Sequence, residues 1–275
     1  MRDTEIEIRP THGLAHLGLA DLWRYRDLAY FFVWRDVKVR YKQTFFGAAW
    51  AIIQPLVLMV VFTLLFGRVL NIATPKDVPK PVFYFAGLVP WTLFAAALAS
   101  ASGSLASNAM LIRKIYFPRL ILPISAVGSN LVDFAVALGV LFVMLFAYGI
   151  GVSTKVVWLP LLTCLALITA IAVSLWLSAL NARYRDAQYM IPFLVQILLF
   201  VTPVMYSSSQ IPADVRPLYF LNPMAGVVEG FRWALADAAP APGPMTLIST
   251  AITLTLLVGG LFYFRAAERT FADLI

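Results

Sequence analysis

Long apolar stretches alternate with short polar segments along most of the chain. An α-helix needs about 20 mostly apolar residues to cross a bilayer. Six stretches have this character, at residues 45–70, 82–107, 120–150, 157–180, 190–206 and 245–264. Prolines interrupt several of them, which membrane helices tolerate when neighbours satisfy the freed carbonyls. The pattern predicts an all-α polytopic membrane protein with six transmembrane helices.

Residues 21–44, ahead of the first stretch, predict an amphipathic helix lying in the headgroup plane. Its apolar stripe follows helical spacing, and a basic stripe lies beside it: Tyr30, Val33, Trp34, Val37 and Tyr41, then Arg35, Lys38 and Lys42. A plain juxtamembrane anchor remains the alternative. We therefore divide the chain into an N-terminal arm and interface helix (1–44), a six-helix domain (45–264) and a tail (265–275).

Two segments between the stretches carry apolar side chains where a solvated loop has little reason to have them. Residues 108–119 combine large apolar groups with three cations: Leu111, Ile112, Arg113, Lys114, Ile115, Tyr116, Phe117 and Arg119. Docking into a partner's groove explains this mixture, and a tight turn lying on the membrane is the alternative.

The second segment, 207–243, is long and proline-rich with an amphipathic centre, and it predicts re-entrant helices on the opposite side. Gly226 and Gly230 lie four residues apart, which permits close helix approach. Glu229 and Arg232 lie three apart and could form an ion pair.

Composition supports the membrane class. Hydrophobic residues make up 61% of the 275 residues and charged residues 13%, whereas soluble domains carry about a quarter charged residues. The net charge of +7 comes from cations clustered at membrane edges, so lipid headgroups explain it better than nucleic acid does. The single cysteine, Cys164, allows no internal disulfide.

The distribution of lysine and arginine predicts the orientation. With the N-terminus inside, cytoplasmic segments hold fifteen of these cations and the opposite side holds six, a strong positive-inside bias. Both termini are expected in the cytoplasm.

Signatures of catalysis are sparse. The chain has no G-x-x-x-x-G-K-[ST] phosphate loop. His12 and His16 have the spacing of metal ligands, but Gly13 weakens a helix there, and we expect no metal. Asp133 is the one clear ionisable residue within the spans, about 20 Å along its helix and near mid-bilayer. Such a carboxylate suggests function; staying protonated or hydrogen-bonding a neighbouring helix are the structural alternatives, and we favour a structural role.

Several motifs occur in order along nearly the whole chain: residues 35–47 with Trp50 and Gln54-Pro55, then 115–119, 183–186, 202–204 and 222–224. Together they resemble the permease subunits of type 2 ABC exporters, which move lipid-linked O antigen, capsule or teichoic acid. The resemblance implies a homodimer with a channel at its axis in the bacterial inner membrane. It also implies two copies of a separate ATPase, which would bind the ATP and Mg²⁺, while this chain binds no cofactor and is no enzyme.

The resemblance also implies roles for segments and residues. Residues 108–119 match the coupling helix, 21–44 the interface helix and 207–243 the outer gate, with Gly226, Glu229, Gly230 and Arg232. Spans one and five match a lateral gate for the lipid anchor. Candidate sugar-path aromatics are Phe62, Phe66, Tyr84, Trp91, Phe193, Phe200 and Tyr206. Independently, charge suggests that the lipid pyrophosphate is attracted by Arg35, Lys38, Arg40 and Lys42.

We therefore expect a permease for a lipid-linked polysaccharide, O antigen before capsule or teichoic acid. The alternative from another class is a polytopic membrane transferase acting on lipid-linked sugars. That enzyme would need acid–base or metal-ligand residues converging near one membrane face.

Overall fold

The computed structural model describes residues 19–42, 47–75, 78–184, 186–268 and 271. These residues form helices and connecting turns, without a strand among them. Five helical stretches are long and apolar enough to cross a membrane: Ala49–Val69, Lys80–Ser102, Ile121–Ala147, Thr154–Arg183 and Pro244–Glu268. A further apolar helix, α10 (Ala187–Val201), is shorter. The prediction of an all-α, multi-pass membrane protein is confirmed.

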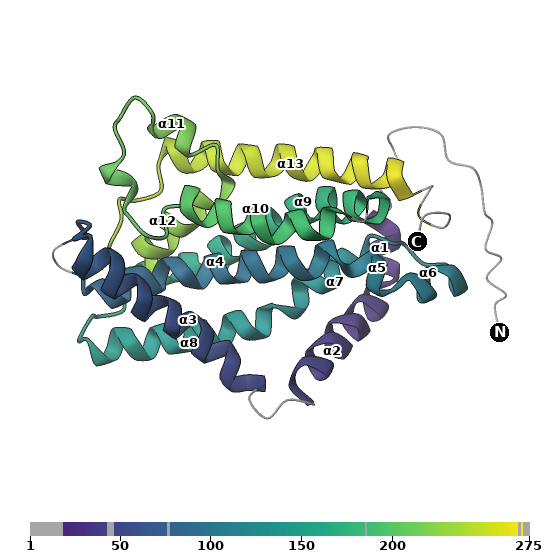
Figure 1. Cartoon of the computed structure of the whole chain (residues 1–275), viewed down its shortest axis with the longest axis horizontal. Helices are drawn as coiled ribbons and strands as arrows, with labels where there is room; N and C mark the ends of the chain where they lie inside the picture. Colours follow the sequence, from purple (N-terminus) through teal and green to yellow (C-terminus); the bar gives the residue numbers. More distant parts are fainter. Residues whose placement is uncertain (1–18, 43–46, 76–77, 185, 269–270, 272–275) are drawn as a thin grey trace.

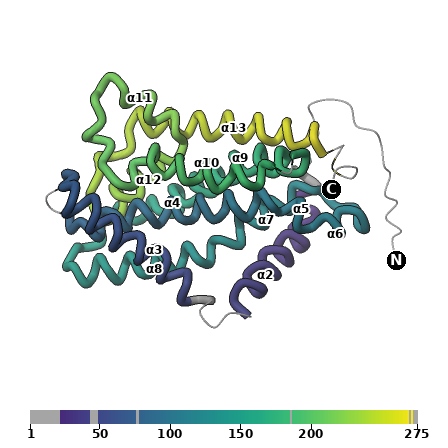
Figure 2. Tube along the Cα trace, viewed as in Figure 1, coloured from purple at the N-terminus to yellow at the C-terminus, as the bar shows by residue number. Residues whose placement is uncertain are grey.

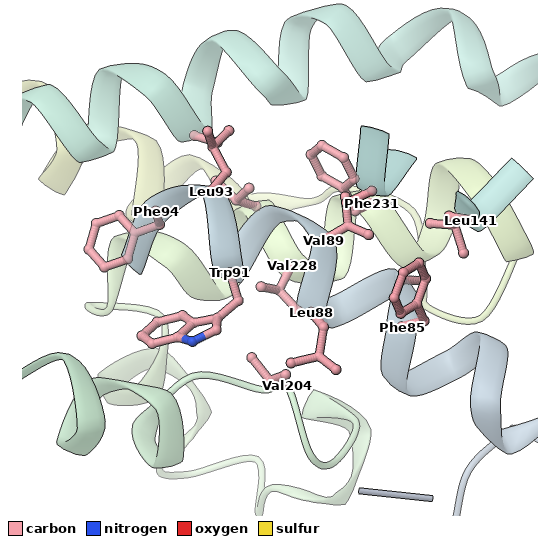
Figure 3. Packing of buried hydrophobic residues seen from close by; sticks show 14 of the residues in the cluster. Phe85, Leu88, Val89, Trp91, Leu93, Phe94, Leu141, Val204, Val228 and Phe231 are labelled. Carbon is pink, nitrogen blue, oxygen red and sulfur yellow. The ribbon is translucent and has the colours of Figure 1, made fainter. Parts of the chain in front are cut away.

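Helix α4 (Lys80–Ser102) forms the centre of the bundle and is buried along most of its length. Its neighbours are α3, α7, α8, α9, α10 and α12. Figure 3 shows Leu88, Val89 and Phe94 of α4 packed among side chains that include Val228 and Phe231. A transmembrane helix can leave its apolar side chains facing lipid. Because α4 is instead buried along most of its length, it is the span that other helices surround.

Two of the spans are interrupted helices. Helix α3 (Gly47–Phe62) continues into a π-helical turn, η1 (Thr63–Val69), where the Leu70 amide donates to the carbonyl of Leu65. The third span consists of α7 (Ile121–Ser129) and α8 (Leu131–Ala147), joined at Asn130. The chain bends there, so that α7 approaches α2 while α8 continues beside α3 (Figure 1).

The last full-length pair is α9 (Leu159–Arg183), preceded by the 3-10 turn η2 (Thr154–Trp158), and α13 (Pro244–Glu268). The two helices pack closely along their length. Thr169 and Thr253 are buried and their hydroxyls are 3.1 Å apart. The Trp176 indole donates to the carbonyl of Leu256 at 2.9 Å.

The N-terminal region forms α1 (Leu19–Arg24) and α2 (Arg26–Lys42). Helix α2 packs on α7, where Val33 would meet a Cβ added at Gly128 at 3.2 Å. Its buried contact runs through Phe32, whereas Tyr30 and Trp34 of the predicted apolar stripe stay exposed. The helix thus contacts protein on one side and leaves aromatic side chains on another.

Two short helices and the last turn of α13 lie at the same end of the molecule as α1 (Figures 1 and 2). They are α5 (Ser104–Ser107) and α6 (Ala109–Lys114). At the other end lie η3 (Ser208–Gln210), α11 (Arg216–Tyr219) and α12 (Pro223–Ala236). Helix α12 is almost wholly buried, against α4, α9 and α13.

Candidate functional site

A cavity of about 880 Å³ opens between α3, α4, α8 and α10. Its walls are mainly apolar, with two tryptophans, Trp50 and Trp91. Polar side chains that line it are Arg40, Gln54, Thr92, Ser100, Asn130 and Asp133. An apolar chamber with aromatic rings and a few convergent polar groups is typical of a ligand site.

The polar groups form a connected cluster around Asp133. Its carboxylate accepts hydrogen bonds from the Arg40 guanidinium and the Tyr41 hydroxyl. Arg40 also donates to the Asn130 side-chain oxygen at 3.3 Å, and the Asn130 amide donates to Ser100 at 2.9 Å. These partners come from outside the spans: the bend between α7 and α8 brings Asp133 to the end of α2. The favoured structural reading, a hydrogen bond between helices, is what the contacts provide.

Burial raises the pKa of Tyr41 to about 12, and the hydrogen bond to Asp133 adds to that effect. Tyr41 therefore stays protonated and continues to donate to the carboxylate across the ordinary pH range.

The four cations predicted to attract a lipid headgroup differ in exposure. Arg35 and Arg40 are partly buried and contact protein groups: Arg35 pairs with Asp36 at 2.8 Å and donates to Asn108 at 3.0 Å. Lys38 and Lys42 are exposed. Only the two lysines present their charge mainly to the surroundings.

The predicted coupling segment, 108–119, is divided between buried and exposed side chains. Ile112 and Phe117 are buried, with the Phe117 ring 6.0 Å from that of Phe32. Ile115 and Tyr116 project outward, with 56% and 89% of their surfaces exposed, and Arg113 and Lys114, the last two residues of α6, are exposed as well. The segment is therefore anchored by one face and presents an apolar and basic face outward.

At the other end of the molecule, Arg232 is fully buried. Its guanidinium donates to the carbonyls of Phe83 at 3.2 Å, Val204 at 2.6 Å and Tyr206 at 3.1 Å, and also to that of Pro203. The predicted pair with Glu229 is present at 3.4 Å. Arg232 thereby satisfies the backbone of the non-helical stretch that follows α10.

The two glycines of α12 contact different helices. A Cβ on Gly226 would meet Ser249 of α13 at 3.0 Å, and one on Gly230 would meet Leu162 of α9 at 2.6 Å. The predicted close approach is therefore present on two sides of α12.

The candidate sugar-path aromatics lie in different surroundings. Phe62 and Tyr84 are buried in the core with their rings 6.4 Å apart, and Phe66 packs on Phe62 at 5.4 Å. Trp91 lines the cavity. Phe193 and Phe200 of α10 are exposed by 65% and 55%. The Tyr206 hydroxyl pairs with that of Tyr219.

Sequence reasoning missed the partners of Asp133 and the polar side chains Gln54, Ser100 and Asn130 of the cavity wall. Gln54 and Asn130 could have been recognised from the sequence, because a side-chain amide within an apolar stretch is costly unless it is hydrogen-bonded. His12 and His16 lie outside the described residues. Within the described part of the chain, no three of the residues His, Cys, Asp and Glu gather as metal ligands do.

Comparison with known proteins adds the family. Residues 28–236 match the model of the ABC-2 type transporter family. An O-antigen export system permease protein RfbA of Myxococcus xanthus is 31% identical over 256 residues, which cover 90% of this chain and 96% of that protein. A protein of the same name from Klebsiella pneumoniae is 29% identical, over 88% of this chain and 92% of its own.

A more distant relative is the polysialic acid transport protein KpsM of Escherichia coli, 25% identical over 85% of this chain and 91% of its own. The matched residues, 28–236, include most of α2, the cavity walls, the segment 108–119 and α12. The chain belongs to the ABC-2 type transporter family.

Proposed function

We propose that this chain is the transmembrane permease half of an ATP-driven exporter and that its cargo is a lipid-linked polysaccharide, with O antigen as the first candidate. The observation that carries the proposal is similarity along 90% of the chain to a permease named for O-antigen export. The work of the chain is conformational gating. ATP and Mg²⁺ belong to a separate ATPase subunit, and this chain itself binds no cofactor.

A capsule polysaccharide is the second candidate cargo, and similarity to a polysialic acid transport protein favours it. Deleting the gene from its host and probing the cell surface with antibodies to each polymer distinguishes the two. Loss of one surface polymer, with its lipid-linked form accumulating inside, identifies the cargo. A strain that makes no polymer at all would point instead to the transferase alternative.

We further place the chain in the bacterial inner membrane as a homodimer with six crossings and both termini in the cytoplasm. Support for an even number of crossings comes from α1 and the end of α13, which lie at one end of the bundle (Figure 1). Five long spans are an odd number, so α10 and the stretch after it would supply the sixth.

We assign the outward face of residues 108–119 to the contact with two ATPase copies. Support comes from the exposure of Met110, Ile115 and Tyr116 next to Arg113 and Lys114. Exposed apolar side chains with cations beside them suit a partner's groove better than water. The buried Ile112 and Phe117 would transmit a push from the ATPase into the bundle.

Replacing Ile115 with Glu tests this contact. Since Ile115 is more than half exposed, the variant should fold and insert but lose the ATPase on co-purification. Tyr184→Glu is the matched control, because Tyr184 is 53% exposed and follows α9, whose end contacts that of α4 through Asn181 and Ser102 at 2.9 Å. If the Ile115 variant retains the ATPase, this surface is not the ATPase contact. If the unmodified protein binds no ATPase, the proposal that it works with one is wrong.

The cavity is our candidate for one half of the sugar path. It is lined mainly by α3, the first expected span, and by α4 and α8, with Leu199 from α10, the fifth expected span. Sugars stack their C–H faces on rings such as those of Trp50 and Trp91. In a dimer with its axis near this face, two cavities would join into one channel. The exposed Phe193 and Phe200 of α10 would then lie at the gate through which the lipid anchor leaves.

At the far end we assign residues 207–243 to an outer gate. The support is that α12 is buried against three spans while α11 and its flanking loops are exposed. Arg232, Glu229, Gly226 and Gly230 would hold α12 as the fixed part of that gate.

A further inference from the structure

The coupling segment, residues 108–119, is fastened at both ends by side chains from outside it. At its beginning, the Asn108 side-chain oxygen accepts a hydrogen bond from Arg35 of α2 at 3.0 Å. At its end, the backbone amide of Arg119 donates to the Glu268 carboxylate at 3.2 Å, and the Arg119 guanidinium donates to the Glu268 carbonyl. Glu268 is the last residue of α13.

Glu268 is itself held in position. Its carboxylate pairs with Arg265, one turn earlier on α13, at 2.8 Å, and its side chain is only 17% exposed. These two are the only ionic side chains of α13, and both lie in its last turn. The two charged side chains of this otherwise uncharged helix therefore lie at the turn that Arg119 contacts.

A phenylalanine beyond the helix strengthens the same junction. Phe271 is fully buried, with its ring 5.3 Å from Phe264 in an edge-to-face arrangement and the Arg119 guanidinium 6.0 Å above it. It belongs to one apolar cluster with Phe32 of α2 and with Ile112 and Phe117 of the coupling segment. Edge-to-face rings and a guanidinium over a ring are both attractive arrangements.

From these contacts we propose that the last turn of α13, with Phe271, is a brace that fixes the trailing end of the coupling segment. Arg119 and Glu268 are positioning residues: they make the segment move as one body with α13, so that a displacement by the ATPase reaches the last span. Without this junction, Asn108 and the buried Ile112 and Phe117 would still hold the segment to the bundle, but its displacement would not be passed to α13. This inference rests on the proposed transport function.

The test compares Arg119→Met and Glu268→Gln with a control, Arg183→Met, in the membrane-reconstituted complex of permease and ATPase and in cells. Arg183 is an exposed arginine in the last turn of α9 whose guanidinium lies over its neighbour Tyr184. The readouts are ATPase co-purification, ATP hydrolysis, and surface polysaccharide at matched permease levels. Glu268→Gln keeps the shape and an accepting oxygen, so it guards against a variant that fails to fold.

We expect both variants to retain the ATPase and hydrolyse ATP at the control rate. Surface polysaccharide should fall by about three- to thirtyfold in Arg119→Met, the range of coupling effects seen for residue networks, and by less in Glu268→Gln, which keeps an oxygen that can accept from the Arg119 amide. Arg119→Lys, which keeps the charge, should recover part of the loss. Export per ATP equal to the control in both variants would overturn the brace while leaving the transport function intact. Failure of the unmodified permease to bind any ATPase would overturn the transport function and this inference with it.

Discussion

Arg232 carries a full charge with no exposed surface, which is costly unless every donor is used. Four carbonyls and Glu229 accept from it, and its guanidinium lies 3.8 Å from the Phe83 ring. Removing one member of such a buried pair typically costs about 3–5 kcal/mol, because the other charge is left unpaired. The close fit around Arg232 also restricts its neighbours.

Gly87 lies against this guanidinium, and a Cβ there would come within 2.7 Å of Arg232 Nη2. We expect Gly87→Ala to destabilise the protein by about 1–3 kcal/mol, the usual cost of overpacking. Gly139→Ala is the matched control, because a Cβ at Gly139 meets nothing within 4 Å and alanine favours a helix. Thermal unfolding in detergent measures both, and equal melting temperatures would contradict the crowding.

Tyr41 offers a prediction with a pH dependence. Its pKa is raised to about 12 from about 10, so the protonated hydroxyl contributes fully below about pH 10 and is lost only as pH rises through about 12. Tyr41→Phe should therefore lower stability by about 1–3 kcal/mol, the range for removing a hydrogen bond to a charged, partly buried acceptor, and equally at pH 6 and pH 9. A deficit that shrinks by pH 9 would show that the hydroxyl ionises earlier.

For individual residues, the spacing in the sequence predicts ion pairs within one helix but not ion pairs between helices. Glu229 and Arg232 are three residues apart, so their contact follows from helical geometry. Arg40 and Asp133 are separated by ninety-three residues. Their meeting depends on the bend at Asn130. The residues Gly128-Ser129-Asn130 interrupt the apolar stretch 120–150, but they do not specify which helix the bend approaches.

At the scale of helices, α2 combines an anchoring side and a charged side. Lys38 and Lys42 are exposed, while Arg40 is bound to Asp133. Lys38→Gln with Lys42→Gln should weaken attraction of an anionic headgroup by about 1 kcal/mol per lysine without changing thermal stability. Arg40→Gln should instead lower stability. Export at matched permease levels, together with melting temperature, separates the two, and unchanged export in the double variant would end the headgroup role.

Helix positions were well predicted wherever a long apolar stretch lies between charged segments, as for α4, α9 and α13. The interruptions were not predicted. The π-helical turn at Thr63–Val69 and the bend at Asn130 depend on how neighbouring helices pack, and apolar composition alone is the same with or without them. Likewise, the amphipathic centre of residues 207–243 predicts a re-entrant helix with a close helix approach, but not that three spans cover α12.

On the scale of the whole molecule, α10 decides the topology. Fifteen residues at about 1.5 Å each fall short of a hydrocarbon core about 30 Å thick. After Val201 the chain continues in turns and bends to Tyr206, and non-helical backbone is tolerated at membrane depth only when its polar groups are satisfied by protein. Arg232 supplies donors to Pro203, Val204 and Tyr206, so a short helix can complete a crossing.

This reasoning predicts that the two ends of α10 face opposite sides of the membrane. In a Cys164→Ser background, we would place single cysteines at Tyr184, before α10, and at Asp214, after it; both positions are exposed. A membrane-impermeant maleimide added to spheroplasts should label the cysteine at 214 and reach that at 184 only after the membrane is permeabilised. Because α9 and α13 cross in either case, labelling of both positions from one side would make α10 re-entrant and the number of crossings odd. Arg119 and the end of α13 would then lie on opposite sides of the membrane, which contradicts the hydrogen bonds between Arg119 and Glu268.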